Sequence, residues 1–400
     1  MLYCTFQTLT IFLVTKGATE TCSTPEKTMG WREELFELIL ADDHNSLDPL
    51  LSGSVSELKA RGAHRCWHKH STFLEHLVGV HNILRLWGQG RKIGRVGLFH
   101  SAYSNSYVNL ALFDPNKDSE RKIMSEMVGA PAEDIIHMFC IIDRQKVVVD
   151  TLLKGGFIPP QGLSVPHLRH TEVTVFLSAD TLRMLVVFTM ADLADQYFGW
   201  QDRLFGGEEL VNSMLLPNEN PSSHDSRAIW PGLSQPGIWM SYVSQLGAVA
   251  RTFQSIGDAG YDPDDQRLAD LPPVFDNCSK VLTRDDEMKA RDLYWTVVMG
   301  EIKLSNDIIA TLETAVTFNP WAFEPYVLLA QKYLHENNFN AALGAAERAL
   351  ELQLQWGTAW DKRLSFAAWV AWTRVMYQRA EAKLDWPENS WEVNNFGLVH

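Results

Sequence analysis

Apolar residues three and four positions apart dominate residues 30–200, and this spacing constrains the fold more than any other feature of the chain. Residues with this spacing lie on one face of a helix, so each such stretch can bury an apolar stripe and expose a polar face. Strand-like alternation is confined to short stretches such as residues 173–177. The helical candidates are residues 72–87, 90–103, 120–144 and 181–197. They predict an all-α fold whose helices pack as a bundle.

Two changes of composition divide the chain. Residues 206–237 are rich in Gly, Pro, Asn and Ser, and residues 262–277 contain further prolines, so neither stretch sustains a helix. Length points the same way, because 400 residues exceed what one hydrophobic core usually organises. The predicted parts are a leader (1–29), a helical domain (30–205), a connection with one helix (206–282), a helical array (283–384) and a tail (385–400).

The C-terminal third has small and aromatic residues in a recurring helical register. The set comprises Tyr326, Leu329, Ala330, Tyr333, Phe339, Ala342, Ala346 and Ala349. This register resembles the tetratricopeptide repeat, in which small residues let two antiparallel helices approach closely while aromatic residues fill the gaps. Degenerate copies flank it, with Ala315 and Pro320 before it and Trp360 and Leu364 after it. The resemblance implies that residues 283–384 bind a protein or a peptide segment.

Three short pieces of the helical domain contain residues that suit a metal site. They are residues 73–80 (FLEHLVGV), 97–101 (GLFHS) and 190–195 (MADLAD). In order and spacing they resemble the HD superfamily of metal-dependent phosphohydrolases, especially the alarmone-hydrolase domain of the RelA/SpoT type. The resemblance implies an HD-like helical bundle in which a divalent metal such as Mn, Mg or Fe is held by His76, His100 and Asp192.

The HD pattern is interrupted directly after its second histidine. The family has an aspartate there, whereas this chain has Ser101, and Ser104-Asn105 replaces an acidic pair expected shortly afterwards. These changes remove anionic ligands and a candidate base, so Ser101 is the candidate catalytic residue of any activity that remains. Residues 98–103 (LFHSAY) and 139–144 (FCIIDR) are also similar to a bacterial and algal family without known activity, in which serine follows the histidine.

Each candidate ligand has a structural alternative. His76 lies beside the apolar face of its helix, where a histidine is often a hydrogen-bonded core residue instead of a ligand. His100 ends an apolar run, which places its imidazole at a helix end that faces the bundle. Asp192 precedes Asp195 by three residues, so one of them could face solvent while the other faces inward. The resemblance favours Asp192.

A cluster of basic residues precedes the first of these helices. Arg65, Lys69 and His70 are candidates to bind a phosphate group, and His70 could add a third imidazole to the site. The alternative is a charged loop that faces water. Asp143-Arg144 is likewise either a pair within the site or an ion pair at the surface.

Charge and cysteine content restrict the partners and the compartment. The net charge of −14 repels nucleic acid and anionic membranes, and no stretch is apolar over the length of a membrane span. Five cysteines without a C-x-x-C pair indicate reduced thiols and a cytoplasmic location. Residues 1–14 are moderately apolar and leave targeting open: they suit a poor secretory signal, a mobile leader, or sequence upstream of a start at Met29.

The sequence therefore predicts a regulatory or adaptor protein. Its array would bind a segment of a partner protein, and its HD-like pocket would bind a metal or a phosphorylated small molecule. The alternative is a metal-dependent phosphohydrolase that uses His76, His100 and Asp192, with Ser101 and water in place of the missing aspartate. The local signatures of P-loop proteins, serine hydrolases and zincins do not occur.

Overall fold

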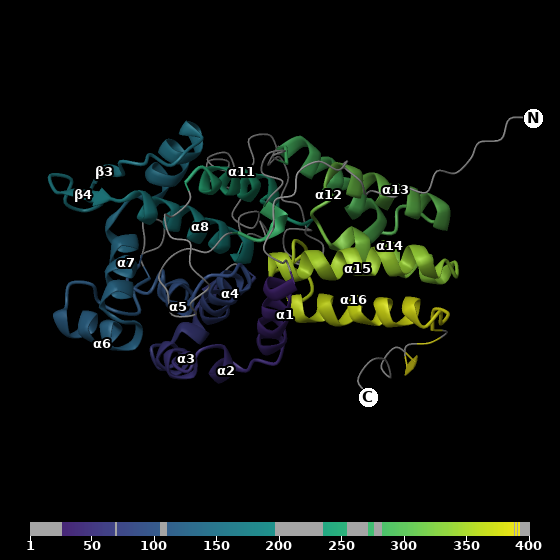
Figure 1. The fold of residues 1–400 in the computed structure, drawn as a ribbon, viewed down its shortest axis with the longest axis horizontal. Coiled ribbons are helices and arrows are strands. Elements are labelled where there is room, and N and C mark those ends of the chain that lie inside the picture. Colours follow the sequence, from purple (N-terminus) through teal and green to yellow (C-terminus); the bar gives the residue numbers. More distant parts are fainter. Residues whose placement is uncertain are drawn as a thin grey trace, which may run out of the picture.

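The computed structural model describes residues 26–68, 70–104, 110–196, 235–253, 271–275, 282–387, 389 and 391–392, with side chains from residue 33 onward. Over these residues the chain is almost entirely helical, and its sheet structure is limited to two short antiparallel hairpins (Figure 1). The predicted all-α class is confirmed. In the same ranges, every helix is too short or too polar to cross a membrane.

The N-terminal region contains the elements that surround the candidate site. They are α1 (Glu26–Leu40), α2 (His44–Leu47), α3 (Leu51–Ala60), the 3-10 helix η1 (Ala63–Arg65), β1 (Trp67–His68), β2 (Ser71–Thr72), α4 (Phe73–Leu86), α5 (Arg91–Phe99), α6 (Asp118–Val128), α7 (Ala130–Ile141), the π-helix η2 (Gln145–Leu153), β3 (Leu163–Pro166), β4 (Thr174–Leu177) and α8 (Ala179–Gln196). Helix α1 begins inside the segment predicted as a leader.

Local capping groups set the boundaries of the helices in this region. Thr72 caps α4, because its hydroxyl accepts from the Glu75 amide at 3.2 Å while the Glu75 carboxylate accepts from the Thr72 amide at 2.9 Å. The helical segment predicted over residues 120–144 contains two helices, α6 and α7. Gly129 separates them with a φ of +89°, a conformation that glycine adopts without the strain of a side chain.

Helix α8 is the central helix of the N-terminal region. It packs against α4 and against a later helix, α11 (Met240–Arg251), and nearly all of its side chains are buried. It begins two residues before the predicted start, because the Ser178 hydroxyl accepts from the Thr181 amide at 3.2 Å and caps it. A helix with buried residues on every side is suited to this position.

Helices α4 and α5 approach each other closely at a glycine. A Cβ atom on Gly97 of α5 would lie 2.4 Å from a methyl group of Leu84 and 3.3 Å from one of Val80, both on α4. The missing side chain therefore allows the end of α5 to lie against α4. This contact determines how near the residue that follows α5, His100, comes to α4.

Most of the predicted connection lies outside the described residues, but its one predicted helix is present as α11. A buried carboxylate on α12 (Arg284–Val298) caps the start of α11. Glu287 accepts from the amides of Trp239, Met240 and Ser241 at 3.0, 2.9 and 2.7 Å. The first turn of a helix leaves such amides without partners, so this carboxylate joins the array to the connection.

The C-terminal array continues with α13 (Ser305–Phe318), α14 (Glu324–His335), α15 (Phe339–Trp356) and α16 (Phe366–Glu381). Consecutive helices pack against each other, and the long helices α15 and α16 lie side by side (Figure 1). Ala330 of α14 and Ala342, Ala346 and Ala349 of α15 are fully buried. Small residues thus fill the contact between α14 and α15 as expected, while the assignment to tetratricopeptide repeats stays a prediction.

The array and the N-terminal region share one hydrophobic core. The buried apolar residues of both form a single cluster in the described part of the chain, and α15 contacts both α4 and α1. An ion pair between Arg374 of α16 and Glu37 of α1 adds a polar contact at the surface. The predicted boundary therefore separates two regions that pack against each other.

Candidate metal centre

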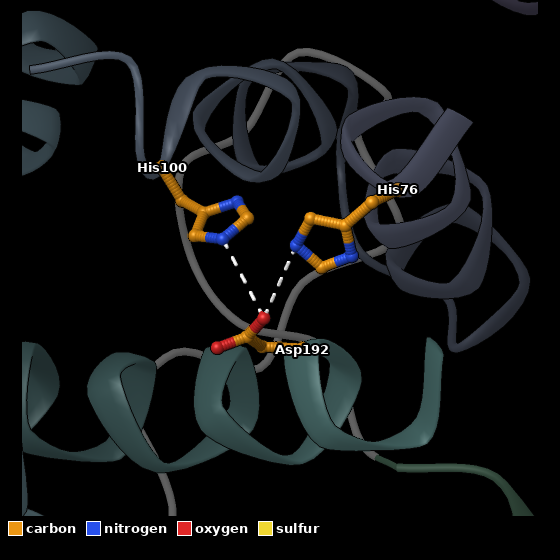
Figure 2. Close-up of side chains that lie close together, drawn as sticks. All are labelled: His76, His100 and Asp192. Atoms are coloured by element: carbon orange, nitrogen blue, oxygen red, sulfur yellow. Dashed lines mark ion pairs between the residues drawn. The ribbon is translucent and has the colours of Figure 1, made fainter. Parts of the chain in front are cut away.

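Three helices place the predicted ligands next to one another. His76 lies one turn into α4, His100 directly follows α5, and Asp192 lies near the end of α8, as Figure 2 shows. All three side chains are buried, with exposed fractions of 2–3%. The structure thus brings together residues that are far apart in the sequence.

The two imidazole rings converge on one oxygen atom. Nε2 of His76 lies 3.3 Å from Oδ1 of Asp192, and Nε2 of His100 lies 3.6 Å from the same atom (Figure 2). One ligand atom from each residue lies within 4.8 Å of the others, so the group could hold a metal ion. The predicted set of His76, His100 and Asp192 is therefore one site.

The remaining nitrogen of each ring is bound to an acceptor. Nδ1 of His76 lies 2.7 Å from Oδ2 of Asp195, and Nδ1 of His100 lies 2.7 Å from the carbonyl oxygen of Gly97. Because a carboxylate and a carbonyl can only accept, each Nδ1 carries a proton and donates it. In their neutral forms both rings then direct an Nε2 lone pair at a carboxylate oxygen, an arrangement that needs a proton or a metal cation between them.

Further hydrogen bonds orient the carboxylate of Asp192. The Arg144 guanidinium donates to Oδ2 at 2.7 Å, and the Gln196 amide donates to Oδ1 at 2.8 Å. Gln196 in turn lies 2.8 Å from Nε2 of His68, whose ring contacts that of His76 in a tilted arrangement with centroids 4.5 Å apart. The side chain of Asp192 is thereby fixed with Oδ1 towards the two histidines.

The charged groups of the centre stabilise one another in their ionised forms. Burial by itself would lower the pKa of His76, but hydrogen bonds to Asp192 and Asp195 outweigh it and raise that pKa to about 9. Burial would raise the pKa of Asp192, yet Arg144 and the two histidines hold it well below its usual range. A metal bound here would therefore displace a proton from His76 and meet two ionised carboxylates.

A glycine makes room for Asp195. A Cβ atom on Gly79 of α4 would lie only 2.0 Å from Oδ1 of Asp195 and 2.8 Å from its Cγ. Gly79 lies three residues after His76, so the same helix provides both the imidazole and the space for the carboxylate that holds it. This glycine is part of the site although it offers no polar side chain.

The neighbours of the predicted ligands differ in part from the sequence expectation. Asp192 and Asp195 are both buried, so neither is the solvent-facing partner that their spacing allowed. The Asp143-Arg144 pair divides between two places: Arg144 binds Asp192 inside the site, whereas Asp143 lies 3.5 Å from Lys146 in a more exposed ion pair. The sequence allowed a pair within the site or an ion pair at the surface, and neither alternative describes this arrangement.

The other candidates take different positions. Ser101 is buried directly after His100, and its catalytic role stays a prediction. Arg65 is exposed and donates to His64 at 3.3 Å, while Lys69 lies outside the described residues. His70 is half-buried near His76, Asp195 and Lys362, but it does not belong to the group of ligand atoms around Asp192.

Sequence reasoning left the place of Asp195 open and missed Gln196 and Lys362. Asp195 and Gln196 follow Asp192 at helical spacing, which could have indicated that they share its face. His68 precedes His76 across a short hairpin, and Lys362 comes from the distant array, so no local spacing indicates either of them.

A protein-family model matches a part of the chain that contains some residues of this centre. Residues 57–144 match a family model described as a domain of unknown function (DUF6817). The matched segment contains His76, His100 and Arg144 and ends before Asp192. No curated protein and no solved structure matches the chain. The resemblances to the HD superfamily and to tetratricopeptide repeats remain predictions.

Proposed function

We propose that the protein is a metal-binding regulatory or adaptor protein. A divalent metal is held by His76, His100 and Asp192, and helices α12–α16 bind a segment of a partner protein. The observation that carries the metal assignment is the convergence of two Nε2 atoms on Oδ1 of Asp192, with both Nδ1 atoms tied to acceptors. Metal-binding histidines typically donate their second nitrogen in this way.

The donor set narrows the choice of metal. Two imidazole nitrogens and one carboxylate oxygen suit Fe²⁺ or Mn²⁺ better than Mg²⁺, which prefers oxygen ligands in octahedral geometry. Three protein ligands leave coordination positions for water or for an oxygen of a bound molecule. A phosphorylated small molecule is the ligand we propose for them.

One observation favours a second candidate function, a metal-dependent phosphohydrolase. Arg144 binds Asp192, and Lys362 lies near Asp195, so cationic groups flank the proposed metal. Such groups stabilise the oxygens of a phosphoryl group during transfer. In this reading Ser101 and a water molecule take the place of the aspartate that the HD family has at this position.

Metal content and phosphoester hydrolysis of the purified full-length chain test the two candidates together. We expect metal in the wild type, less metal in His76→Gln, and tighter Mn²⁺ binding in Ser101→Asp, which adds a carboxylate. His81→Gln is the matched control, because His81 is also fully buried on α4 but bonds Asn82 and lies outside the centre. A wild type that binds none of the offered metals contradicts the proposal, and turnover of a phosphoester panel selects the second candidate.

A further inference from the structure

The last residue of α15 and the segment that follows it touch both helices that carry the first and last proposed ligands. We call residues 356–362 the junction segment. The carbonyl of Trp356 accepts from the indole of Trp87 at 3.1 Å, and Gly357 packs so closely on Leu86 that a Cβ atom there would lie 2.8 Å from a Leu86 methyl group. Both contacts are at the end of α4, the helix of His76.

Lys362 joins the junction segment to the end of α8. Its Nζ donates to the carbonyl oxygen of Ala194 at 2.7 Å and to the hydroxyl of Thr358, which itself donates to the same carbonyl at 3.4 Å. Ala194 lies between Asp192, the ligand, and Asp195, the anchor of His76. A cation from the array therefore lies next to the turn of α8 that builds the centre.

Lys362 carries a positive charge at neutral pH. Burial lowers the pKa of Lys362 to about 8, and the negative charges of Asp195 and Glu324 oppose that shift. Lys362 is therefore mostly protonated at neutral pH.

Glu324 fixes the junction segment to the array. This residue begins α14, is fully buried, and accepts from the amides of Trp360 and Asp361 at 2.6 and 2.9 Å. The segment is thus bound to α14 on one side and to α4 and α8 on the other. A movement of α14 relative to α8 would move Lys362 relative to Asp195.

We propose that Lys362 is an opposing charge, supplied by the array, that lowers the affinity of the centre for a divalent cation. The inference rests on the proposed metal-binding function. The ammonium group lies against the turn of α8 that carries Asp192 and Asp195, so its charge repels a cation held by His76 and Asp192, and a partly buried setting screens that repulsion less than water does. A partner that draws the junction segment away from α8 would then tighten metal binding, and metal would tighten partner binding equally.

The test is a calorimetric titration of the full-length, metal-free chain with Mn²⁺ at constant pH and ionic strength. Lys362→Met removes the charge, and we expect it to bind Mn²⁺ about tenfold more tightly than the wild type. Lys362→Arg and Thr358→Val keep the charge and should retain the wild-type affinity. Lys303→Met is the control for a charge elsewhere in the array, since Lys303 is exposed between α12 and α13. If Lys362→Met does not fold, Lys362→Gln replaces it, because the amide keeps a donor for Ala194.

The outcomes separate this inference from the proposed function. If the wild type binds Mn²⁺ and Lys362→Met binds it equally or more weakly, the opposing role of Lys362 is rejected. The proposed metal centre still stands in that case. Binding in Lys362→Met but not in the wild type supports the opposing charge and contradicts metal binding by the wild type. No binding in either protein rejects both.

Discussion

Nδ1 of His76 lies 2.7 Å from Oδ2 of Asp195, a residue 119 positions later in the chain, and this contact fixes which nitrogen of His76 faces Asp192. The contact is buried and direct, so Asp195 orients the imidazole and increases its basicity. Asp195 thus belongs to the centre without being one of its three proposed ligands.

Replacing Asp195 should therefore weaken metal binding without removing a ligand. We expect Asp195→Ala to reduce Mn²⁺ affinity about 10- to 100-fold, because His76 loses the acceptor that holds its ring. Asp180→Asn is the control, since Asp180 is an exposed acid on the same helix. Equal affinities in the wild type and Asp195→Ala, measured by calorimetry, would show that Asp195 does not support the centre.

Gly79→Ala should disturb the same contact from the opposite side. The new methyl group would overlap Asp195, and overpacking of this kind typically costs about 1 to 3 kcal/mol of unfolding free energy. Gly53→Ala is the matched control, because Gly53 also lies in a helix but a Cβ there meets no atom within 4 Å. Chemical denaturation compares the two variants, and a Gly79→Ala protein as stable as Gly53→Ala would refute the close contact.

The sequence predicted which three residues converge in the centre better than it predicted their surroundings. His76, His100 and Asp192 followed from a resemblance in residue order, which three spaced motifs can show. Asp195 and Arg144 were noticed but left open, because burial depends on helices that pack from elsewhere in the chain. Lys362 could not be predicted, since its place depends on how the array docks on α8.

In the fold, too, features set by neighbouring residues were predicted, whereas features set by contacts between distant residues were not. Amphipathic spacing located helices such as α4 and α8, and local caps set their ends, as Thr72 does for α4. The break at Gly129 depends on a backbone conformation that periodicity does not reveal. The shared core of the array and the N-terminal region depends on contacts between distant segments, such as Gly357 with Leu86.

The pH dependence of stability should report the buried carboxyl group of Glu324. Burial raises the pKa of Glu324 from 4.5 to about 7, against the lowering effect of its backbone hydrogen bonds. The folded state thus holds a proton that the unfolded state has lost, so this contribution to stability is complete below pH 4.5 and is lost as the pH rises to about 7.

Glu324→Gln should remove this dependence, which amounts to about 3 kcal/mol for a shift of this size. Urea unfolding of the wild type and the variant at acidic and neutral pH measures the difference, with Glu347→Gln, an exposed change on α15, as the reference. Parallel pH profiles for wild type and Glu324→Gln would show that Glu324 keeps its ordinary pKa.

Ala346→Trp should destabilise the array. Ala346 is fully buried on α15, where an indole has no space, and we expect a loss of about 1 to 3 kcal/mol or more of unfolding free energy. Gly344→Ala is the control on the same helix, since a Cβ at Gly344 meets no atom within 4 Å. Thermal unfolding decides the point: an Ala346→Trp variant that melts with the wild type would place Ala346 at the surface.

Metal analysis of the purified full-length protein tests the central claim most directly. Wild type, His100→Ala and His81→Gln are each stripped of metal, incubated with Fe²⁺ or Mn²⁺, separated from free metal and analysed by mass spectrometry. The account predicts stoichiometric metal in the wild type and in His81→Gln, and a large loss in His100→Ala, because His100 provides one of only two imidazole ligands. Equal metal content in His100→Ala and wild type, or no metal in any of the three, would contradict it.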